Sequence, residues 1–200
     1  GMDSSPIGTH KQLRFKTGIR KKTWNKNVIS LGLAAGFLEP LESTSIHLIQ
    51  TAIARLMTNF PDKHFNEADT NYYNERTLLE YEQVRDFLIL HYKATERDDT
   101  PFWNYCRNME IPKTLKDRMG IYLENARLYR HDNELFGDAS WFAVMHGQNM
   151  HPQRFHPNAN IMPDAELDKR MSEIHKTWAA CLDTLPTHQE YIDQHCKADI

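Results

Sequence analysis

The first residues that could carry chemistry form the segment Glu39–Ser45, in which two glutamates are followed by three hydroxyl residues. It joins a small, apolar stretch to a stretch with helical periodicity. The first turn of a helix leaves backbone N–H groups unpaired and carries a partial positive charge, so it can bind an anion. Serine and threonine are also preferred helix caps. Two interpretations stay open: an anion site with acids beside it, or a capped helix whose acids complement the dipole.

Three histidines in or near one proline-containing loop form a second candidate: His146, His151 and His156. Histidine is the commonest metal ligand, which raises the hypothesis of a zinc or iron site. Their spacing matches no ligand signature, and no Cys pair or HExxH helix lies nearby. Two of the three precede proline, which favours turn positions. We therefore predict no metal site.

Two pairs of adjacent aromatic residues form a third candidate, Phe102 with Trp103 and Trp141 with Phe142. Each pair follows a short loop. Neighbouring residues on a helix point in different directions, so one ring can pack inward while the other lines a cleft. We predict that these four residues bind a planar aromatic substrate. Packing in the core is the alternative for any single ring.

The composition excludes several classes of protein. The 200 residues are 40% hydrophobic and 26% charged, which is typical of a globular chain. A net charge of −3 argues against a dedicated nucleic-acid binder. The three cysteines lack any CxxC pair, as in reduced cytoplasmic proteins. No apolar run reaches the roughly 18 residues of a membrane helix. We predict a cytoplasmic protein with neither a nucleic-acid nor a membrane partner.

Two strand-like segments lie near the amino end. Leu13–Thr17 alternates apolar and polar residues before Gly18, as in a short strand that ends in a turn. Asn27–Gly36 is small and apolar with β-branched members, as in a buried strand or a tight strand-like segment. Between Lys11 and Lys26 there are seven Lys or Arg residues and no acid. The alternation in this stretch favours a solvated face over a phosphate-binding one.

Helical periodicity governs the chain from Ile46 onward. Apolar residues recur at steps of three and four in five or six helices, predicted at 46–60, about 74–93, after Pro101, after Pro112, at 167–181 and about 188–196. The stripe of the first consists of Ile46, Ile49, Ile53, Leu56 and Phe60, and that of the fourth consists of Leu115, Met119, Tyr122, Ala126 and Tyr129. Gly120, inside the fourth helix, costs roughly 1 kcal/mol relative to alanine, so packing must hold that helix. The chain is therefore predicted to be mainly α. Two strands are too few to bury residues 28–35 on both faces, which indicates one part of a larger sheet.

The string from Trp24 to Thr44, which ends in GFLEPLEST, resembles the flavin-dependent halogenases that act on tryptophan. Further resemblance lies in Arg14–Gly18, Phe60–Asp62, Arg85–Lys93, Glu134–Phe136 and Ser140–Trp141. It implies that residues 46–200 form the helical, substrate-side domain at the carboxy end of such an enzyme. Residues 1–45 would be a remnant of the flavin-binding domain that includes the strand-to-helix junction.

The resemblance also implies roles for single residues. Glu42 matches the family glutamate that faces the substrate, where it helps to orient the halogenating species or takes up the proton of the arenium ion. Ser43 matches the wall between the flavin and substrate compartments, and these two are the predicted catalytic residues. The backbone amides of Thr44 and Ser45 match the halide site. Several members have glycine where this chain has Ser45.

The implied reaction halogenates an electron-rich aromatic such as tryptophan or another indole. It uses oxygen, chloride or bromide, and reduced FAD that a separate flavin reductase supplies. Leu33 and Ile46 match positions near the flavin ring. The chain has no GxGxxG sequence, and the family's catalytic lysine and WxWxIP segment belong to the amino-terminal half, which is absent. We therefore expect this chain alone to be inactive and not to retain flavin.

A non-catalytic helical module is the alternative. It would bind a partner or a small aromatic ligand, and it would cover its exposed strand edge by forming a homodimer. The sequence leaves open the arene, the ring position and the choice of halide.

Overall fold

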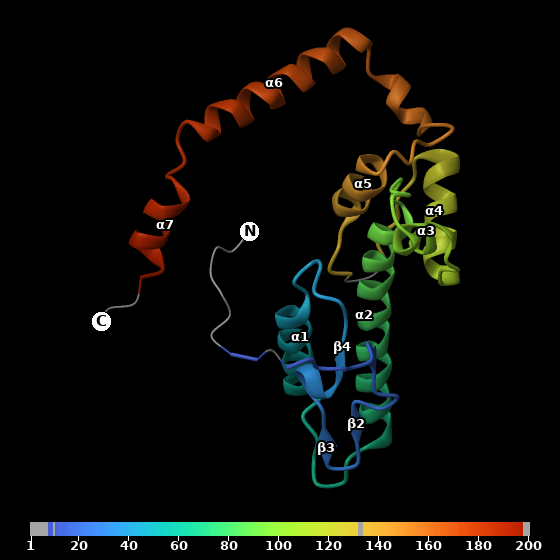
Figure 1. Ribbon diagram of the computed structural model, residues 1–200, viewed down its shortest axis with the longest axis vertical. Coiled ribbons are helices and arrows are strands. Elements are labelled where there is room, and N and C mark those ends of the chain that lie inside the picture. Colours follow the sequence, from blue (N-terminus) through green and yellow to red (C-terminus); the bar gives the residue numbers. More distant parts are fainter. Residues whose placement is uncertain (1–7, 10, 132–133, 198–200) are drawn as a thin grey trace. The chain divides into compact units, whose positions relative to one another are not determined.

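The computed structural model describes residues 8–9, 11–131 and 134–197 and is composed mainly of α-helices (Figure 1). The mainly α fold predicted from the sequence is confirmed. Contacts within the chain separate two units, residues 1–154 and residues 155–200. The predicted division at residues 45 and 46 concerns the origin of the two segments and stays a prediction. No helix within the described ranges is long and apolar enough to cross a membrane.

The first unit is built around the long helix α2, which contacts α1, α3, α4, α5 and strand β2 (Figure 1). Its helices are α1 (Ser45–Thr58), α2 (Glu67–Lys93), α3 (Pro101–Asn108), α4 (Lys113–Asn125) and α5 (Asp138–Gly147). Its strands are β1 (Gly18–Ile19), β2 (Trp24–Asn25), β3 (Val28–Ile29) and β4 (Gly36–Phe37), with a 3-10 turn, η1, at Gly32–Ala34.

The strands form two antiparallel pairs, β1 with β4 and β2 with β3. The predicted strand at 13–17 is wrong, because pairing begins only at Gly18. The segment 27–36, predicted as a buried strand or a tight strand-like segment, contains β3 and the first residue of β4, but it is not one continuous strand, since Gly32 adopts a φ of 57° and η1 interrupts it. Val28 and Leu33 are 62% and 74% exposed, because no described strand covers them.

The helices begin and end close to the predictions, with three differences. Helix α2 starts earlier, at Glu67, because the Asn66 side chain accepts a hydrogen bond from the Ala68 amide and caps it. Helix α4 ends at Asn125, where Ala126 turns left-handed with φ 54°, so the predicted stripe stops short of Tyr129. Helix α5 is not among the predicted helices, because a short loop and the aromatic pair Trp141 and Phe142 show no helical periodicity.

Two hydrophobic clusters hold the first unit together, and α2 contributes to both. One contains Phe87, Leu90, Leu115, Tyr122, Trp141 and Met145, and it joins α2 to α4 and α5. The other contains Leu48, Tyr81, Val84 and Leu88, and it joins α2 to α1. Full burial of such side chains supplies the main favourable free energy for packing α2 among its neighbours.

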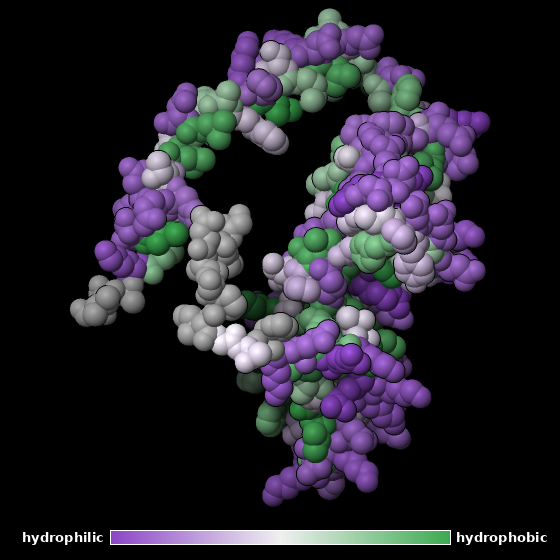
Figure 2. All heavy atoms as spheres, in the orientation of Figure 1, coloured by the Kyte–Doolittle hydropathy of each residue, from purple (hydrophilic) through white to green (hydrophobic). Residues whose placement is uncertain are grey.

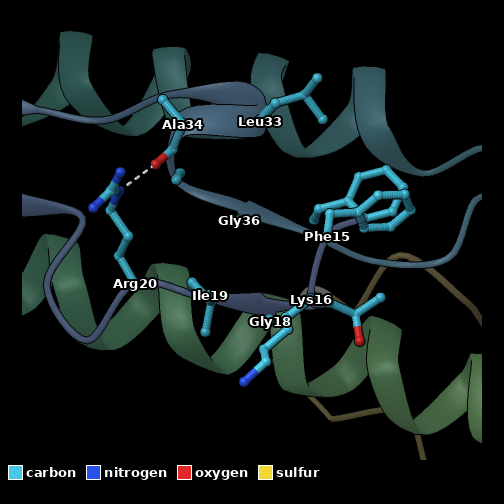
Figure 3. Close-up of a pocket in the computed structure, with 11 residues that line it drawn as sticks. Phe15, Lys16, Gly18, Ile19, Arg20, Leu33, Ala34 and Gly36 are labelled. Carbon is cyan, nitrogen blue, oxygen red and sulfur yellow. Dashed lines mark hydrogen bonds between the residues drawn. The ribbon is translucent and has the colours of Figure 1, made fainter. Parts of the chain in front are cut away.

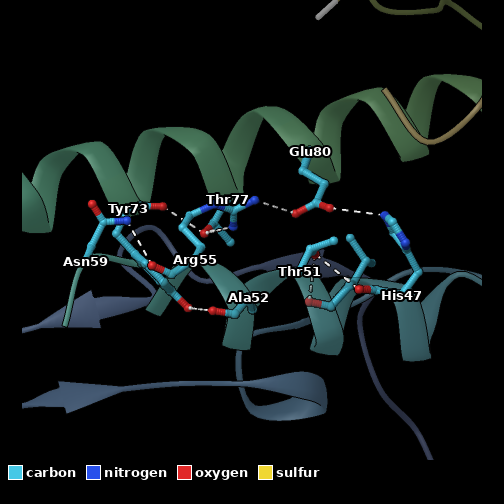
Figure 4. Close-up of polar contacts among 9 residues, drawn as sticks. His47, Thr51, Ala52, Arg55, Asn59, Tyr73, Thr77 and Glu80 are labelled. Carbon is cyan, nitrogen blue, oxygen red and sulfur yellow. Dashed lines mark hydrogen bonds and ion pairs between the residues drawn. The ribbon is translucent and has the colours of Figure 1, made fainter. Parts of the chain in front are cut away.

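A polar network reinforces the contact between α1 and α2 (Figure 4). Arg55 donates to Thr77 Oγ1 at 2.8 Å and to Glu80 at 2.9 Å. The other Glu80 oxygen lies 3.3 Å from His47 Nε2. Because these contacts span α1 from His47 to Arg55, they fix the helix along its length and therefore the position of its first turn.

The second unit contains a 3-10 turn, η2 (Pro157–Ile161), and two helices, α6 (Asp164–Leu182) and α7 (His188–His195). Both predicted helices are present. Figure 2 shows hydrophobic residues along α6. Five large side chains of this helix are exposed at helical spacing: Leu167, Met171, Ile174, Trp178 and Leu182. Helix α7 begins with a capping box between Thr187 and Glu190.

Candidate functional site

The turn before α1 has an unusual backbone. The Ser43 amide donates to the Pro40 carbonyl at 2.9 Å, which closes a tight turn. Ser43 itself is left-handed, with φ 54°, a conformation that costs a non-glycine residue roughly 1–3 kcal/mol. The turn points the chain into α1, whose N-cap residue is Thr44. Sequence reasoning predicted three capping candidates but not this strained geometry.

The start of α1 has no side-chain cap. Thr44 is 3% exposed, and its hydroxyl makes no capping hydrogen bond. The first turn contains no acidic residue. Within the described part of the chain the amides of Thr44 and Ser45 donate no hydrogen bond either, while the helix dipole places partial positive charge there. This arrangement can hold a small anion, and it lacks the bond on which the simple capping interpretation depends.

Glu42, two residues before the N-cap of α1, contacts α2. Its Oε1 lies 2.9 Å from His91 Nε2, and the Glu42 and His91 side chains are 35% and 18% exposed. The ring of His91 also has Nδ1 2.8 Å from the Phe87 carbonyl and stands edge-on to the Phe87 ring. Sequence reasoning missed His91, although it belongs to the Arg85–Lys93 string of the resemblance.

The other glutamate of the turn, Glu39, lies near Tyr92. Burial, and next the negative charge of Glu39, raise the pKa of the Tyr92 phenol. The Oε2 atom of Glu39 is buried and has no hydrogen-bond partner in the described part of the chain. Trp103 stacks on Tyr92 with centroids 6.1 Å apart, and Phe102 meets the same ring edge-on. Tyr92 thus connects the predicted aromatic pair of α3 to the turn.

The second aromatic pair is divided between core and surface. Trp141 is 2% exposed, meets Phe87 edge-on and lies under the Arg118 guanidinium at 4.0 Å. This geometry favours the core-packing alternative for Trp141. Phe142 is 49% exposed and stacks on His146. Its role in substrate binding stays a prediction.

The histidines of the proline-containing loop have structural contacts. The rings of His146 and His151 lie 5.1 Å apart, edge to face. The His156 side chain accepts from the Asn158 amide at the start of η2. Among residues 8–9, 11–131 and 134–197, no group of three or more His, Cys, Asp or Glu side chains is placed to bind a metal ion.

An open groove of about 650 Å³ lies between residues 15–20 and 33–37 (Figure 3). Figure 3 shows the Arg20 side chain reaching the Ala34 carbonyl, to which its Nε donates. Leu33 lines the groove, and Lys16 and Arg20 add positive charge. The groove therefore combines an apolar lining with two positively charged side chains. Ile46, the other residue matched to the flavin, is 69% exposed on α1.

Comparison with known proteins relates this chain to one protein family. A family model for tryptophan halogenases matches residues 2–164. The chain is 26% identical to the tryptophan 7-halogenase RebH of Lentzea aerocolonigenes, over 92% of this chain and 38% of that protein. It is 37% identical to the tryptophan 6-halogenase ThaL of Streptomyces albogriseolus, over 55% of this chain and 21% of that protein.

Two solved structures of halogenases resemble this chain closely. A flavin-dependent halogenase from Xanthomonas campestris has a TM-score of 0.90 at 44% identity, over 96% of this chain and 39% of that one. One from a Brevundimonas species has a TM-score of 0.88 at 38% identity, over 94% and 38%. This chain thus spans less than two fifths of the length of these relatives. It belongs to the tryptophan halogenase family.

Proposed function

We propose that this chain is part of a flavin-dependent halogenase that acts on an electron-rich aromatic such as tryptophan or another indole. One observation carries the proposal: the backbone amides of Thr44 and Ser45, at the start of α1, donate no hydrogen bond to any described residue, so they are available to an anion close to Glu42. A halide ion has the size and charge for such a site. The family resemblance assigns the halide to the same two residues.

Chloride or bromide would lie against the Thr44 and Ser45 amides. Leu33 and Ile46 would contact the flavin ring, and their exposure is in keeping with that role. When bound, reduced FAD supplies the electrons with which oxygen becomes able to oxidise the halide. A separate flavin reductase would supply the reduced FAD by diffusion.

Glu42 and Ser43 would act beside the halide. The His91 contact holds the Glu42 carboxylate to one side of the turn, where it can orient an electrophile or accept the proton that the arene loses. The strained Ser43 would separate the flavin from the substrate. Phe102 and Trp103, grouped with Tyr92, would face the arene. The relatives RebH and ThaL are named for different ring positions, so membership alone does not fix the position.

The chain alone would not run this reaction. It has no GxGxxG sequence, and it spans 38% of the length of RebH. The test compares the chain with a longer protein in which it follows a flavin-binding segment. Each is incubated with flavin, a flavin reductase, chloride or bromide, and tryptophan or indole. Mass spectrometry of the arene then detects halogenated product.

We expect product only from the longer protein. Its Glu42→Gln variant should form product roughly 100-fold more slowly, because an amide cannot accept the proton. Glu110→Gln, a matched change at an exposed position of the same unit, should leave the rate unchanged. A longer protein that binds flavin but halogenates neither arene would argue against the proposal, as would halogenation by the chain alone.

A non-catalytic binding module is the second candidate. The exposed apolar side chains of the first unit, Phe15 and Leu33 among them, favour it because they could bind a partner or a second copy. Sedimentation equilibrium tests the version in which the chain dimerises. A dimer would support this candidate, and a monomer at all concentrations would count against it.

A further inference from the structure

The contacts of His91 set a requirement on protons. One ring nitrogen faces the Phe87 carbonyl at 2.8 Å, and the other faces a carboxylate oxygen of Glu42 at 2.9 Å. A carbonyl and an ionised carboxylate only accept hydrogen bonds, and a neutral imidazole has only one N–H. A neutral ring would therefore place two lone pairs against each other at one of these contacts. For both contacts to be hydrogen bonds, the pair must carry one proton more than a neutral ring and an ionised Glu42, either on the ring or on Glu42.

The surroundings keep the ring in this orientation. His91 stands edge-on to Phe87, with centroids 4.8 Å apart, and Phe87 is 2% exposed. Phe87 is itself fixed by Phe136, stacked at 3.9 Å, and by Trp141. Within the described residues, Glu42 is the charged group that contacts the ring. The ring is thus anchored in the core on one side and meets a single carboxylate on the other.

Because of this contact, the two carboxylate oxygens of Glu42 have different surroundings. Oε1 is engaged by His91, whereas Oε2 has no hydrogen-bond partner among the described residues. A carboxylate that is held through one oxygen keeps the other in a fixed direction. Glu42 itself lies two residues before Thr44, the N-cap of α1.

We propose that a proton shared between His91 and Glu42 holds the Glu42 carboxylate beside the start of α1. His91 is then a positioning residue that acts through Glu42 and does not touch the substrate. The shared proton itself is a property of this chain. Its consequence for catalysis rests on the proposed halogenase function. The experiment therefore has two arms that can fail separately.

The first arm observes the proton directly in this chain. Nuclear magnetic resonance of the chain, with ¹⁵N in histidine and ¹³C in glutamate, reports the protonation of both groups at pH 7. We expect either a doubly protonated His91 ring or a protonated Glu42 carboxyl group. His64, exposed between α1 and α2, is the internal reference. A neutral His91 ring beside an ionised Glu42 would overturn the proposal.

The Glu42→Gln variant sharpens this arm. The glutamine amide can donate a hydrogen bond to Nε2, so the extra proton is no longer needed. We expect His91 to be neutral in this variant, with its one hydrogen on Nδ1, while the signals of His64 stay unchanged. A His91 ring that is doubly protonated in both proteins would also overturn the proposal.

The second arm measures catalysis by the longer protein. His91→Phe keeps the ring packing on Phe87 but cannot donate to Glu42. We expect its kcat to fall roughly tenfold to a hundredfold, with little change in KM for the arene, because only the orientation of Glu42 is lost. His91→Gln can still donate and should recover part of kcat. His64→Phe is the matched control and should leave kcat unchanged.

The outcomes separate the two proposals. An unchanged kcat in a folded His91→Phe protein overturns the positioning role, and circular dichroism checks that the variant folds. If His91→Phe fails to fold, the kcat of His91→Gln is compared with that of wild type instead. The resonance arm still tests whether His91 and Glu42 share a proton. If the unchanged longer protein does not halogenate, the halogenase function fails while the resonance arm still decides whether the proton is shared.

Discussion

Gly36 shows how strongly the site depends on single residues. A Cβ atom at this position would lie 2.7 Å from the Gly18 carbonyl oxygen and 2.9 Å from the Tyr81 ring. Gly36 pairs with Ile19 between β4 and β1, and β4 leads directly to the turn that contains Glu42. A side chain here would push the β1–β4 pair away from α2.

We therefore predict that Gly36→Ala lowers the free energy of unfolding by about 1–3 kcal/mol, which is the usual cost of overpacking. Urea denaturation followed by circular dichroism measures it. Gly120→Ala is the matched control. It lies in the middle of α4 with no atom within 4 Å of the added Cβ, so it should stabilise the chain by up to about 1 kcal/mol. Equal effects of the two changes would contradict this interpretation.

At the scale of single residues, the sequence predicts the features that depend on residue type and on neighbours in the chain. The hydroxyl residues and glutamates of the turn were evident from composition and from the family string. The left-handed Ser43 and the contact between Glu42 and His91 were not. The first is a backbone conformation that serine rarely adopts, and the second joins residues 49 positions apart in the chain. Neither leaves a periodic signal.

Among the elements, helix α1 shows the difference between predicting a helix and predicting its buried face. Its predicted stripe began at Ile46 and included Ile53, yet these residues are 69% and 44% exposed. Leu48 and Ala52 are buried instead, because α2 covers that side. Periodicity indicates that an apolar stripe exists, whereas the partner decides which part of the stripe is buried. A partner outside this chain would leave Ile46 exposed in the same way.

Helix α4 is held to the following segment by a buried ion pair. Two nitrogens of Arg118 donate to the two oxygens of Glu134, one of them at 3.0 Å, and the two side chains are 10% and 3% exposed. The Arg118 guanidinium also covers the Trp141 ring. The pair therefore links α4, the segment before α5 and α5 itself.

We predict that Glu134→Gln lowers the free energy of unfolding by roughly 3 kcal/mol, because it leaves the Arg118 charge buried without a counter-charge. Glu166→Gln is the control, since the Arg170–Glu166 pair on α6 is exposed and should change stability by no more than about 0.5 kcal/mol. Urea denaturation of the three proteins provides the comparison. A Glu134→Gln protein as stable as wild type would show that the pair adds nothing beyond packing.

At the scale of the whole molecule, each unit exposes large hydrophobic side chains that no other part of that unit covers. In the first unit this surface includes Phe15, Val28 and Leu33, and in the second it includes Met171 and Trp178. The sequence indicated the first case, because two strand segments cannot bury an apolar stretch on both faces. It did not indicate the second, since an exposed stripe and a covered one have the same periodicity. Only a three-dimensional structure distinguishes them.

The stability of the whole chain should depend on pH in the alkaline range. Burial raises the pKa of four tyrosines, and for the first three in this list nearby charged or titratable groups modify the shift: Tyr73, Tyr81, Tyr92 and Tyr122. A buried phenolate is disfavoured, so the folded chain keeps these protons at a pH where the unfolded chain releases them. The resulting stabilisation is fully present below the unfolded pKa, near 10, and is lost as the pH rises through the folded values.

We therefore predict that the free energy of unfolding falls as the pH rises above 10, and that the native tyrosines ionise in two groups. Absorbance at 295 nm should show part of the eight tyrosines titrating late in the folded chain, and all of them titrating together in urea. Tyr122 is 0% exposed and its hydroxyl has no partner among the described residues, so Tyr122→Phe should reduce the late group at little cost in stability. A single native transition near pH 10 would mean that these phenols are solvated and that the packing around α2 is looser than the structure describes.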